Sequence, residues 1–327
     1  MPIRSLFDVP APAKLNFFLH VVGKRADGYH LIDSLMVPID WCDTLHFERR
    51  DDGRLARHDL GDPLPDDDLC LRAANALQRA AATPQGADIS IAKRVPSGAG
   101  LGGGSSDAAT TLLALNHLWG LDWPLSRLLP IGLALGADVP FFLGGTPARV
   151  GGIGERLTPV AIASSWFAVV KPDASLATRD IFASPKLAKT FEAARIAGFP
   201  EAARRSRNSR NSRNSRNSRN SRISQCGPAE PREFEPELAE GFGRNDLQPA
   251  AEALCPDVAR AAARLLTAFG NSRMTGSGSA VFARAATAGE DSVPSAAMPS
   301  DWPEGWSSRM CRSLEQHPLV GWAGREG

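Results

Sequence analysis

Long apolar runs are missing from this 327-residue sequence, and so is an excess of either charge. No stretch approaches the ~18 consecutive apolar residues that a membrane span needs. The first ten residues, MPIRSLFDVP, lack the apolar core and the cleavage site of a signal peptide. The formal net charge of +1 is typical of neither nucleic-acid binding nor membrane binding. We therefore expect a cytoplasmic protein with no membrane partner and no nucleic-acid partner.

Cysteine is scarce, and no two cysteines form a CxxC pair. The five residues are scattered along the chain, at Cys42, Cys70, Cys226, Cys255 and Cys311. An odd and scattered set argues against a disulfide framework and against a zinc site. We expect free thiols in a reducing compartment.

The length of the chain predicts two domains, because single hydrophobic cores seldom grow beyond ~250–300 residues. With 43% hydrophobic and 22% charged residues, the composition is that of a globular protein. Strand and helix patterns are interspersed without strict alternation, which predicts an α+β fold. Taking the glycine-rich stretch at 144–155 as the junction, we expect an N-terminal domain over residues 1–150 and a C-terminal domain over residues 151–327.

A three-residue repeat, Ser-Arg-Asn, runs through residues 206–222. Eight arginines lie between residues 204 and 222 with no acid among them, and the rest of the chain carries 29 basic against 36 acidic residues. An arginine-rich arm for RNA is one interpretation. The other is a disordered insertion at about 204–224, which the lack of apolar side chains favours.

Local patterns predict most of the individual elements. Alternating apolar residues indicate strands, at residues 13–22, 43–48, 87–93 and 166–171. Apolar residues at helical spacing indicate helices, at residues 69–80, 108–119 and 255–270. The stretch 126–145 predicts a helix, a tight turn at 136–140 and then a short apolar strand.

Five glycines crowd into residues 98–104, within the stretch RVPSGAGLGGGSSDAAT. Gly98, Gly100 and Gly103 match the dinucleotide pattern G-x-G-x-x-G, but four residues separate them from the preceding strand. No Gly-Lys-Ser/Thr follows for a Walker loop. A glycine loop that leads into a helix still favours phosphate, because backbone N–H groups and the helix dipole point the same way. The alternative is a plain connector, with Ser105 or Ser106 as the N-cap of the helix.

Five separated segments resemble the motifs of the GHMP kinases. They are PAKLN (12–16), RADGYHLIDSL (25–35), PSGAGLGGGSS (96–106), LGADVPFF (135–142) and MTGSGSAVFA (274–283). The resemblance implies the two-domain GHMP kinase fold, with ATP and a small-molecule substrate in the cleft between the domains. RADGYH is similar to the branch whose substrate carries a cytidyl group. For that branch the resemblance implies phosphorylation of the tertiary 2-hydroxyl of a cytidyl-diphospho-methylerythritol, in non-mevalonate isoprenoid synthesis.

Two catalytic residues are implied by the resemblance. Asp138 is a carboxylate in an apolar, glycine-flanked turn, where an unpaired acid is costly. The resemblance makes it the base that accepts the proton of the substrate hydroxyl, and a turn cap is the alternative. Lys14 would lie beside Asp138 and keep it ionised, although without PAKLN it would be expected to face solvent. Asn16 shares its face of the strand and would bind substrate hydroxyls.

The remaining site residues are also carried over from the resemblance. The residues expected to hold the ATP phosphates are Pro96, Ser97, Gly98, Ala99, Gly100, Leu101, Gly102, Gly103, Gly104, Ser105 and Ser106. Mg²⁺ is expected with ATP, held mostly by phosphate oxygens, with Ser106 as its candidate ligand. Tyr29, the only tyrosine, and His30 would bind the cytosine. Phe182 would stack on it as a second aromatic, and Thr178 would bind nearby.

Three rival functions follow from the same sequence. The nearest is a GHMP kinase for another small alcohol, homoserine or mevalonate. A second is an NAD-dependent oxidoreductase, which would need the strand–glycine geometry of a dinucleotide site. A third is an RNA-binding protein that uses the arginine repeat.

Overall fold

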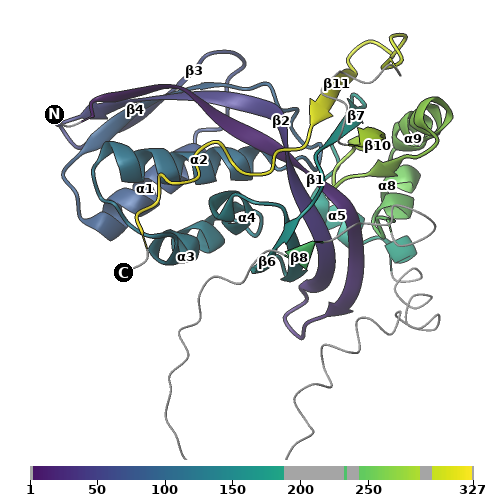
Figure 1. The fold of residues 1–327 in the computed structure, drawn as a ribbon, viewed down its shortest axis with the longest axis horizontal. Coiled ribbons are helices and arrows are strands. Elements are labelled where there is room, and N and C mark those ends of the chain that lie inside the picture. Colours follow the sequence, from purple (N-terminus) through teal and green to yellow (C-terminus); the bar gives the residue numbers. More distant parts are fainter. Residues whose placement is uncertain (1–2, 188–231, 234–242, 288–296, 326–327) are drawn as a thin grey trace, which may run out of the picture.

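The computed structural model describes residues 3–187, 232–233, 243–287 and 297–325. The Ser-Arg-Asn repeat lies outside the described residues. Helices and strands are mixed along the chain, and their arrangement confirms the predicted α+β class. They build two sheets of unequal size, each covered by its own helices (Figure 1).

The larger sheet has seven strands, in the order β3-β4-β2-β5-β6-β8, with β1 paired to β2. Their bounds are β1 (Ser5–Lys24), β2 (His30–Arg50), β3 (Leu55–Asp59), β4 (Gly86–Ala92), β5 (Ala148–Gly152), β6 (Arg156–Ala161) and β8 (Arg232–Glu233). The long antiparallel hairpin β1–β2 extends from this sheet to the second lobe (Figure 1). It therefore links both halves of the molecule.

Four helices cover one face of the larger sheet (Figure 1). They are α1 (Leu69–Ala81), α2 (Gly103–Leu118), α3 (Leu125–Leu135) and α4 (Val139–Gly144). Asp68 caps α1 by accepting a hydrogen bond from the Leu71 amide, as its position before an apolar helical stripe suggests. The middle helix, α2, is buried along nearly all of its length. It is thus a rigid support for whatever binds at its N-terminus.

The smaller sheet has the strand order β11-β7-β10-β9. Its strands are β7 (Ser165–Lys171), β9 (Arg273–Met274), β10 (Val281–Thr287) and β11 (Ser307–Arg312). The helices of this lobe are α5 (Thr178–Phe182), α8 (Gln248–Leu254) and α9 (Pro256–Phe269). Alanine and leucine side chains on one face of α9 are buried against the sheet.

A hydrophobic cluster joins the two lobes. Phe17 of β1 lies 5.2 Å from Phe167 of β7 and 6.3 Å from Phe282 of β10, measured between ring centroids. The chain after β11 then returns across the first lobe, where Leu319 is buried and the Gly324 amide donates to the Trp123 carbonyl at 2.8 Å. The division of the chain at residue 150 stays a prediction, and β5 and β6 continue the first sheet as far as Ala161.

Two local predictions are wrong. The apolar segment after the tight turn is helix α4, not a strand, because Pro140 lies in its first turn, where proline favours a helix. Helix α2 begins before the two serines. Its N-cap is Gly102, with φ of +75°, and Ser105 and Ser106 lie in its first turn. The glycines themselves therefore form the start of the helix.

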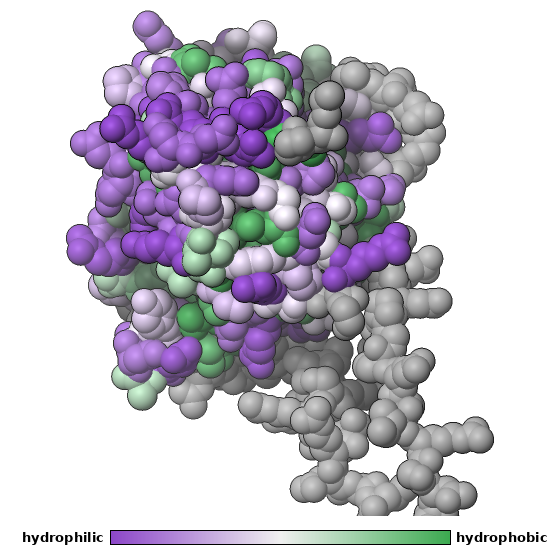
Figure 2. All heavy atoms as spheres, turned by 90° about the vertical axis from the view of Figure 1, so that its left-hand side faces the viewer, coloured by the Kyte–Doolittle hydropathy of each residue, from purple (hydrophilic) through white to green (hydrophobic). Residues whose placement is uncertain are grey.

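The end of the first lobe that carries the N-terminus presents mostly hydrophilic side chains, with apolar ones in small separate groups (Figure 2). Among the described residues, no helix combines the length and the apolar character required to cross a membrane.

Candidate active site

Lys14 lies on β1 and is buried, with 2% of its surface exposed. Its Nζ donates to Asn16 Oδ1 at 2.5 Å and to the Gly100 carbonyl at 2.8 Å. It also lies 3.8 Å from Asp138 Oδ2. The lysine that strand alternation alone would place in solvent therefore joins β1, the glycine loop and the turn before α4.

The position of Asp138 follows from the local sequence. Helix α3 ends at its C-cap Gly136, and α4 begins at Val139 with Pro140 in its first turn, so Asp138 stands at the N-cap position of α4. Its side chain makes no capping hydrogen bond within the described part of the chain. It is 32% exposed and faces a cavity together with Lys14. The carboxylate is thus available for chemistry.

Two opposing effects act on the pKa of Lys14. Burial lowers the pKa, and the charge and hydrogen-bonding of Asp138 partly offset this effect. The net result is a pKa below the usual range of lysine. Asp138 therefore helps to keep a desolvated ammonium group charged.

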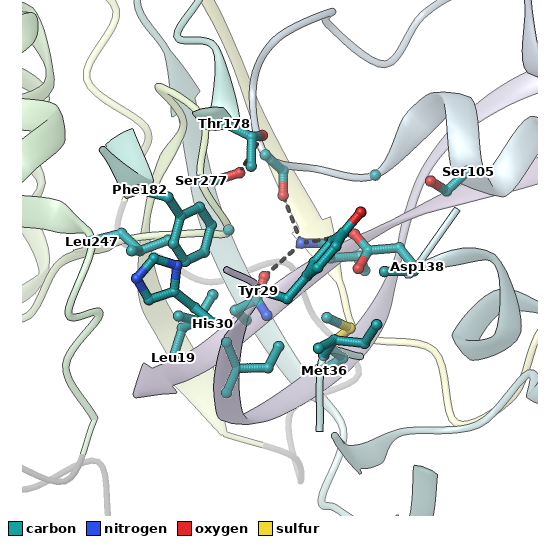
Figure 3. Close-up of a pocket in the computed structure, with 18 of the residues that line it drawn as sticks. Leu19, Tyr29, His30, Met36, Ser105, Asp138, Thr178, Phe182, Leu247 and Ser277 are labelled. Atoms are coloured by element: carbon teal, nitrogen blue, oxygen red, sulfur yellow. Dashed lines mark hydrogen bonds and ion pairs between the residues drawn. The ribbon is translucent and has the colours of Figure 1, made fainter. Parts of the chain in front are cut away.

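The cavity that Lys14 and Asp138 line has a volume of about 720 Å³ and lies between the lobes (Figure 3). His30 and Phe182 stand side by side at one end of it, with ring centroids 5.0 Å apart and an interplanar angle of 27°. Tyr29 is 62% exposed on the turn between β1 and β2 and also lines the cavity. Burial and the charge of Lys24 lower the pKa of His30, which favours a neutral ring.

All five residues expected to bind the substrate line this cavity: Asn16, Tyr29, His30, Thr178 and Phe182. Two lining residues that the sequence did not single out are Ser277 and Met36. Ser277 Oγ lies 2.7 Å from Thr178 Oγ1. In the sequence, the only indication that Ser277 belongs to the site is that a glycine stands on either side of it. Met36 carries no chemical signal, and only its pairing opposite Asn16 brings it to the site.

The glycine loop forms a second, smaller cavity of about 330 Å³. Gly98, Gly100 and Gly102 have φ angles of +64°, +79° and +75°. Alternate left-handed residues turn successive backbone N–H groups toward a common point, and the N-terminus of α2 adds its dipole. Every residue expected to hold phosphate lines this cavity except Ser106. Gly100, Gly102 and Ser105 line both cavities.

Ser106 is fully buried, and its Oγ has no hydrogen-bond partner within the described residues. Nor do the described ranges hold any group of three or more His, Cys, Asp or Glu side chains placed for a metal. The Ser106 oxygen lies at the start of α2 but does not line the cavity of the glycine loop, so Ser106 as a ligand of Mg²⁺ stays a prediction.

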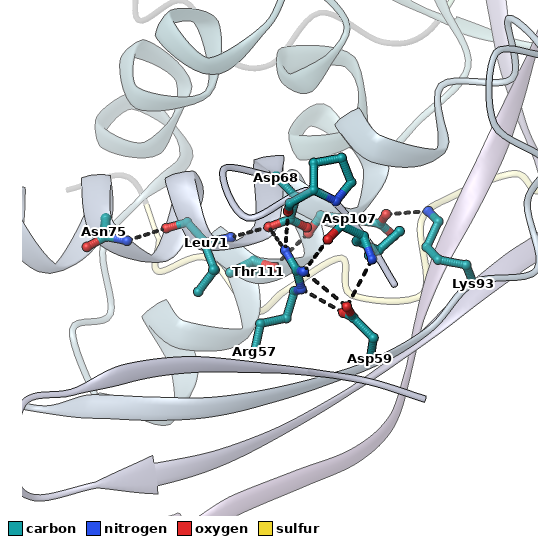
Figure 4. Close-up of polar contacts among 10 residues, drawn as sticks. Arg57, Asp59, Asp68, Leu71, Asn75, Lys93, Asp107 and Thr111 are labelled. Atoms are coloured by element: carbon teal, nitrogen blue, oxygen red, sulfur yellow. Dashed lines mark hydrogen bonds and ion pairs between the residues drawn. The ribbon is translucent and has the colours of Figure 1, made fainter. Parts of the chain in front are cut away.

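A buried ionic cluster of Asp43, Lys93 and Asp107 fixes the base of the glycine loop (Figure 4 shows Lys93 and Asp107). Asp43 Oδ1 accepts from the Val95 amide at 2.8 Å, which ties the loop to β2. Burial lowers the pKa of Lys93, but the two carboxylates more than offset this and raise it. Burial raises the pKa of Asp107.

Figure 4 also shows an ion pair at the start of α1. Arg57 Nη1 lies 2.9 Å from Oδ1 of Asp68, the N-cap of that helix.

The turn 275–279 of the second lobe packs directly on the glycine loop. The Ala280 amide donates to the Ala99 carbonyl at 3.0 Å. A Cβ added at Gly278 would lie 2.0 Å from Gly100 N, so no side chain fits there. The second lobe thus supports the glycine loop through backbone contact.

Two family models match the chain: the GHMP kinases N terminal domain over residues 68–146 and the GHMP kinases C terminal domain over residues 232–300. Among solved structures, a 4-(cytidine 5'-diphospho)-2C-methyl-D-erythritol kinase is 31% identical, with a TM-score of 0.59 over 84% of this chain and 89% of that one. The mevalonate kinase of Methanococcus jannaschii, at 12% identity, has a TM-score of 0.57 over 86% of this chain and 90% of its own, which shows the fold alone. Fold and site together define a GHMP kinase, a phosphotransferase that uses ATP and an alcohol acceptor.

Curated relatives narrow this class. A 4-diphosphocytidyl-2-C-methyl-D-erythritol kinase of Methylibium petroleiphilum is 54% identical over 99% of this chain and 100% of its own length. One from Verminephrobacter eiseniae is 50% identical over 99% of this chain and 100% of its own. The chain belongs to the 4-diphosphocytidyl-2-C-methyl-D-erythritol kinase family, a branch of the GHMP kinases in isoprenoid synthesis. The resemblance that five short segments carried is confirmed.

Proposed function

We propose that this protein transfers the γ-phosphoryl group of ATP to the 2-hydroxyl of 4-diphosphocytidyl-2-C-methyl-D-erythritol. One observation carries the proposal: the cavity of the glycine loop, called the phosphate cavity from here on, shares Gly100, Gly102 and Ser105 with the larger cavity, beside the Lys14–Asp138 pair. A phosphate in the loop and a hydroxyl at Asp138 would therefore meet at this junction. We also keep the proposal of two domains, residues 1–150 and 151–327, with the site between them.

In the proposed reaction, the oxygen of the substrate hydroxyl attacks the γ-phosphorus of ATP, and Asp138 accepts the proton of that hydroxyl. The bond between the γ-phosphorus and the bridging oxygen breaks, and ADP leaves with this oxygen. Lys14 fixes the direction of the Asp138 carboxylate through their ion pair. Asn16 Oδ1 accepts a hydrogen bond from Lys14 Nζ, and Asn16 lines the cavity together with Lys14 and Asp138, where the substrate hydroxyl would bind. The glycine loop binds the phosphates of ATP through backbone N–H groups, in place of a Walker lysine.

Mg²⁺ would enter with ATP, and Ser106 is the residue that would hold it. When bound, it would neutralise phosphate charge. The unpaired Ser106 Oγ supports this assignment.

Tyr29, His30 and Phe182 form the proposed cytosine site, with Thr178 beside them. Stacking on aromatic side chains and hydrogen bonds to the base edge are the usual means of holding a single base. The stacked pair His30–Phe182 at the far end of the cavity from Asp138 supports this orientation. Homoserine and mevalonate have no base to place there.

The purified protein should consume ATP with the cytidyl-diphospho-methylerythritol substrate and show no comparable turnover with homoserine or mevalonate. Coupled ADP release, with each acceptor over the same concentration range, measures this. Turnover on homoserine or mevalonate alone would overturn the substrate assignment. ATP consumption without any of the three acceptors would mean hydrolysis only.

Phe182→Leu should raise the KM for the cytidyl substrate by about five- to hundredfold, since stacking on a base is worth ~1–3 kcal/mol. We expect kcat and the KM for ATP to change little, because Phe182 lies away from the reacting atoms. The matched control is Phe7→Leu, at an aromatic that is 60% exposed and does not line the cavity. An unchanged KM for the cytidyl substrate in Phe182→Leu would show that the cytosine does not stack on Phe182.

A further inference from the structure

Strand β1 has a bulge within the active site. Asn16 pairs with Met36 and Phe18 with Leu35, so Phe17 has no partner of its own on β2. A bulge locally bends its strand and redirects neighbouring side chains. Here the redirected stretch carries Lys14 and Asn16, and the bulge therefore helps to set where these two side chains point.

Two side chains of the second lobe hold the backbone of this bulge. Thr275 Oγ1 accepts a hydrogen bond from the Asn16 amide at 2.8 Å. Arg273 Nη1 donates to the Phe17 carbonyl at 2.6 Å. Gly276 follows in the same direction, and a Cβ added there would lie 3.0 Å from Lys14 Nζ. Residues 273–276 therefore run alongside the catalytic stretch of β1.

Arg273 is an unusual group for such a place. It is 8% exposed, and within the described residues it forms no ion pair. Burial lowers its pKa to about 10, yet it stays charged near neutral pH. A buried guanidinium without a carboxylate is costly, and a leucine or methionine would fill the same space at lower cost. Its contact with the Phe17 carbonyl gives it a role that those residues lack.

The chain also leaves space for this guanidinium. A Cβ added at Gly243 would lie 1.8 Å from Arg273 Nη1. A glycine at residue 243 thus lets Arg273 reach β1. Arg273 itself does not line the substrate cavity.

We propose that Arg273 is a positioning residue for phosphoryl transfer. Its guanidinium fixes the bulge at Phe17 and thereby holds Lys14 and Asn16 in the geometry that the reacting hydroxyl requires. It acts through β1 and does not touch the substrate. This inference rests on the proposed roles of Lys14 and Asn16.

Arg273→Met tests it, since methionine fills space but donates no hydrogen bond. We expect kcat to fall by about 10- to 100-fold, the loss typical of a small misplacement of reacting groups. The KM for ATP should change less than in Lys14→Met, because the hydrogen bond from Lys14 to the Gly100 carbonyl is displaced and not removed. Arg273→Lys keeps the charge and can still donate a hydrogen bond, so its kcat should lie between those of the wild type and Arg273→Met. This conservative variant keeps the test valid if Arg273→Met fails to fold. Arg260→Met, on the outer face of α9, is the control.

A second pair of variants displaces the guanidinium without removing it. Gly243→Ala should reproduce the kcat loss, whereas Gly61→Ala, where an added Cβ meets nothing within 4 Å, should not. Ethylguanidinium added to Arg273→Ala should restore part of kcat. A purely structural role would lower the thermal midpoint and leave kcat per folded molecule within about threefold of wild type, which overturns the proposal. Failure of the proposed function would show in the wild type, which would then not phosphorylate the cytidyl substrate.

Discussion

Asp138→Asn should lower kcat by about 10²- to 10⁴-fold, the range that general-base catalysis usually contributes. Asparagine keeps the shape of the side chain but cannot accept the proton of the substrate hydroxyl. The KM for ATP should change little, because Asp138 does not line the phosphate cavity. Coupled ADP release at saturating substrate measures the effect.

The same substitution should leave the fold intact. The Asp138 side chain makes no capping hydrogen bond in the described structure, and only a 3.8 Å ion pair to Lys14 is lost. Asp122→Asn, which removes an exposed carboxylate outside both cavities, is the matched control. If Asp138→Asn kept wild-type turnover while thermal unfolding was unchanged, the proton would have to pass elsewhere, and Asp138 would be a turn residue only.

The parts of the site that sequence alone indicated are those whose signal is local. Five glycines within seven residues require special backbone angles or close approach, and the φ angles of Gly98, Gly100 and Gly102 bear this out. Asp138 was conspicuous because a lone carboxylate stands in an apolar turn. Such features need only their neighbours in the chain to be interpreted.

The features that sequence missed depend on contacts between distant segments. Alternation along β1 could not show that Lys14 is buried, because the glycine loop and the second lobe cover it. The alternation could not show the bulge at Phe17 either, because the bulge is a shift in the pairing of β1 with β2. Ser277 reaches the site only because its turn packs on the glycine loop. The error at α4 has a local cause, since six apolar residues suit a short helix as well as a strand.

Lys14→Met should lower kcat by about 10²-fold, the loss typical of a misplacement of about 1 Å, because Asp138 loses the ion pair that fixes its direction. Methionine keeps the length of the side chain but leaves Asn16 Oδ1 and the Gly100 carbonyl without their donor. Unlike Asp138→Asn, this variant should also weaken ATP binding, because Gly100 belongs to the phosphate loop. Lys186→Met, at an exposed lysine outside both cavities, is the control.

The pH dependence of kcat separates the charge of Lys14 from its packing. The proposed mechanism needs the ammonium form, which is lost as pH rises through the pKa. Because burial lowers that pKa below 10.5, the wild-type rate should fall on the basic side before an ordinary lysine would titrate. Lys14→Arg keeps the charge at every accessible pH, so its rate, although lower, should show no such basic decline. An identical decline in Lys14→Arg and wild type would assign it to another group and leave Lys14 with a packing role alone.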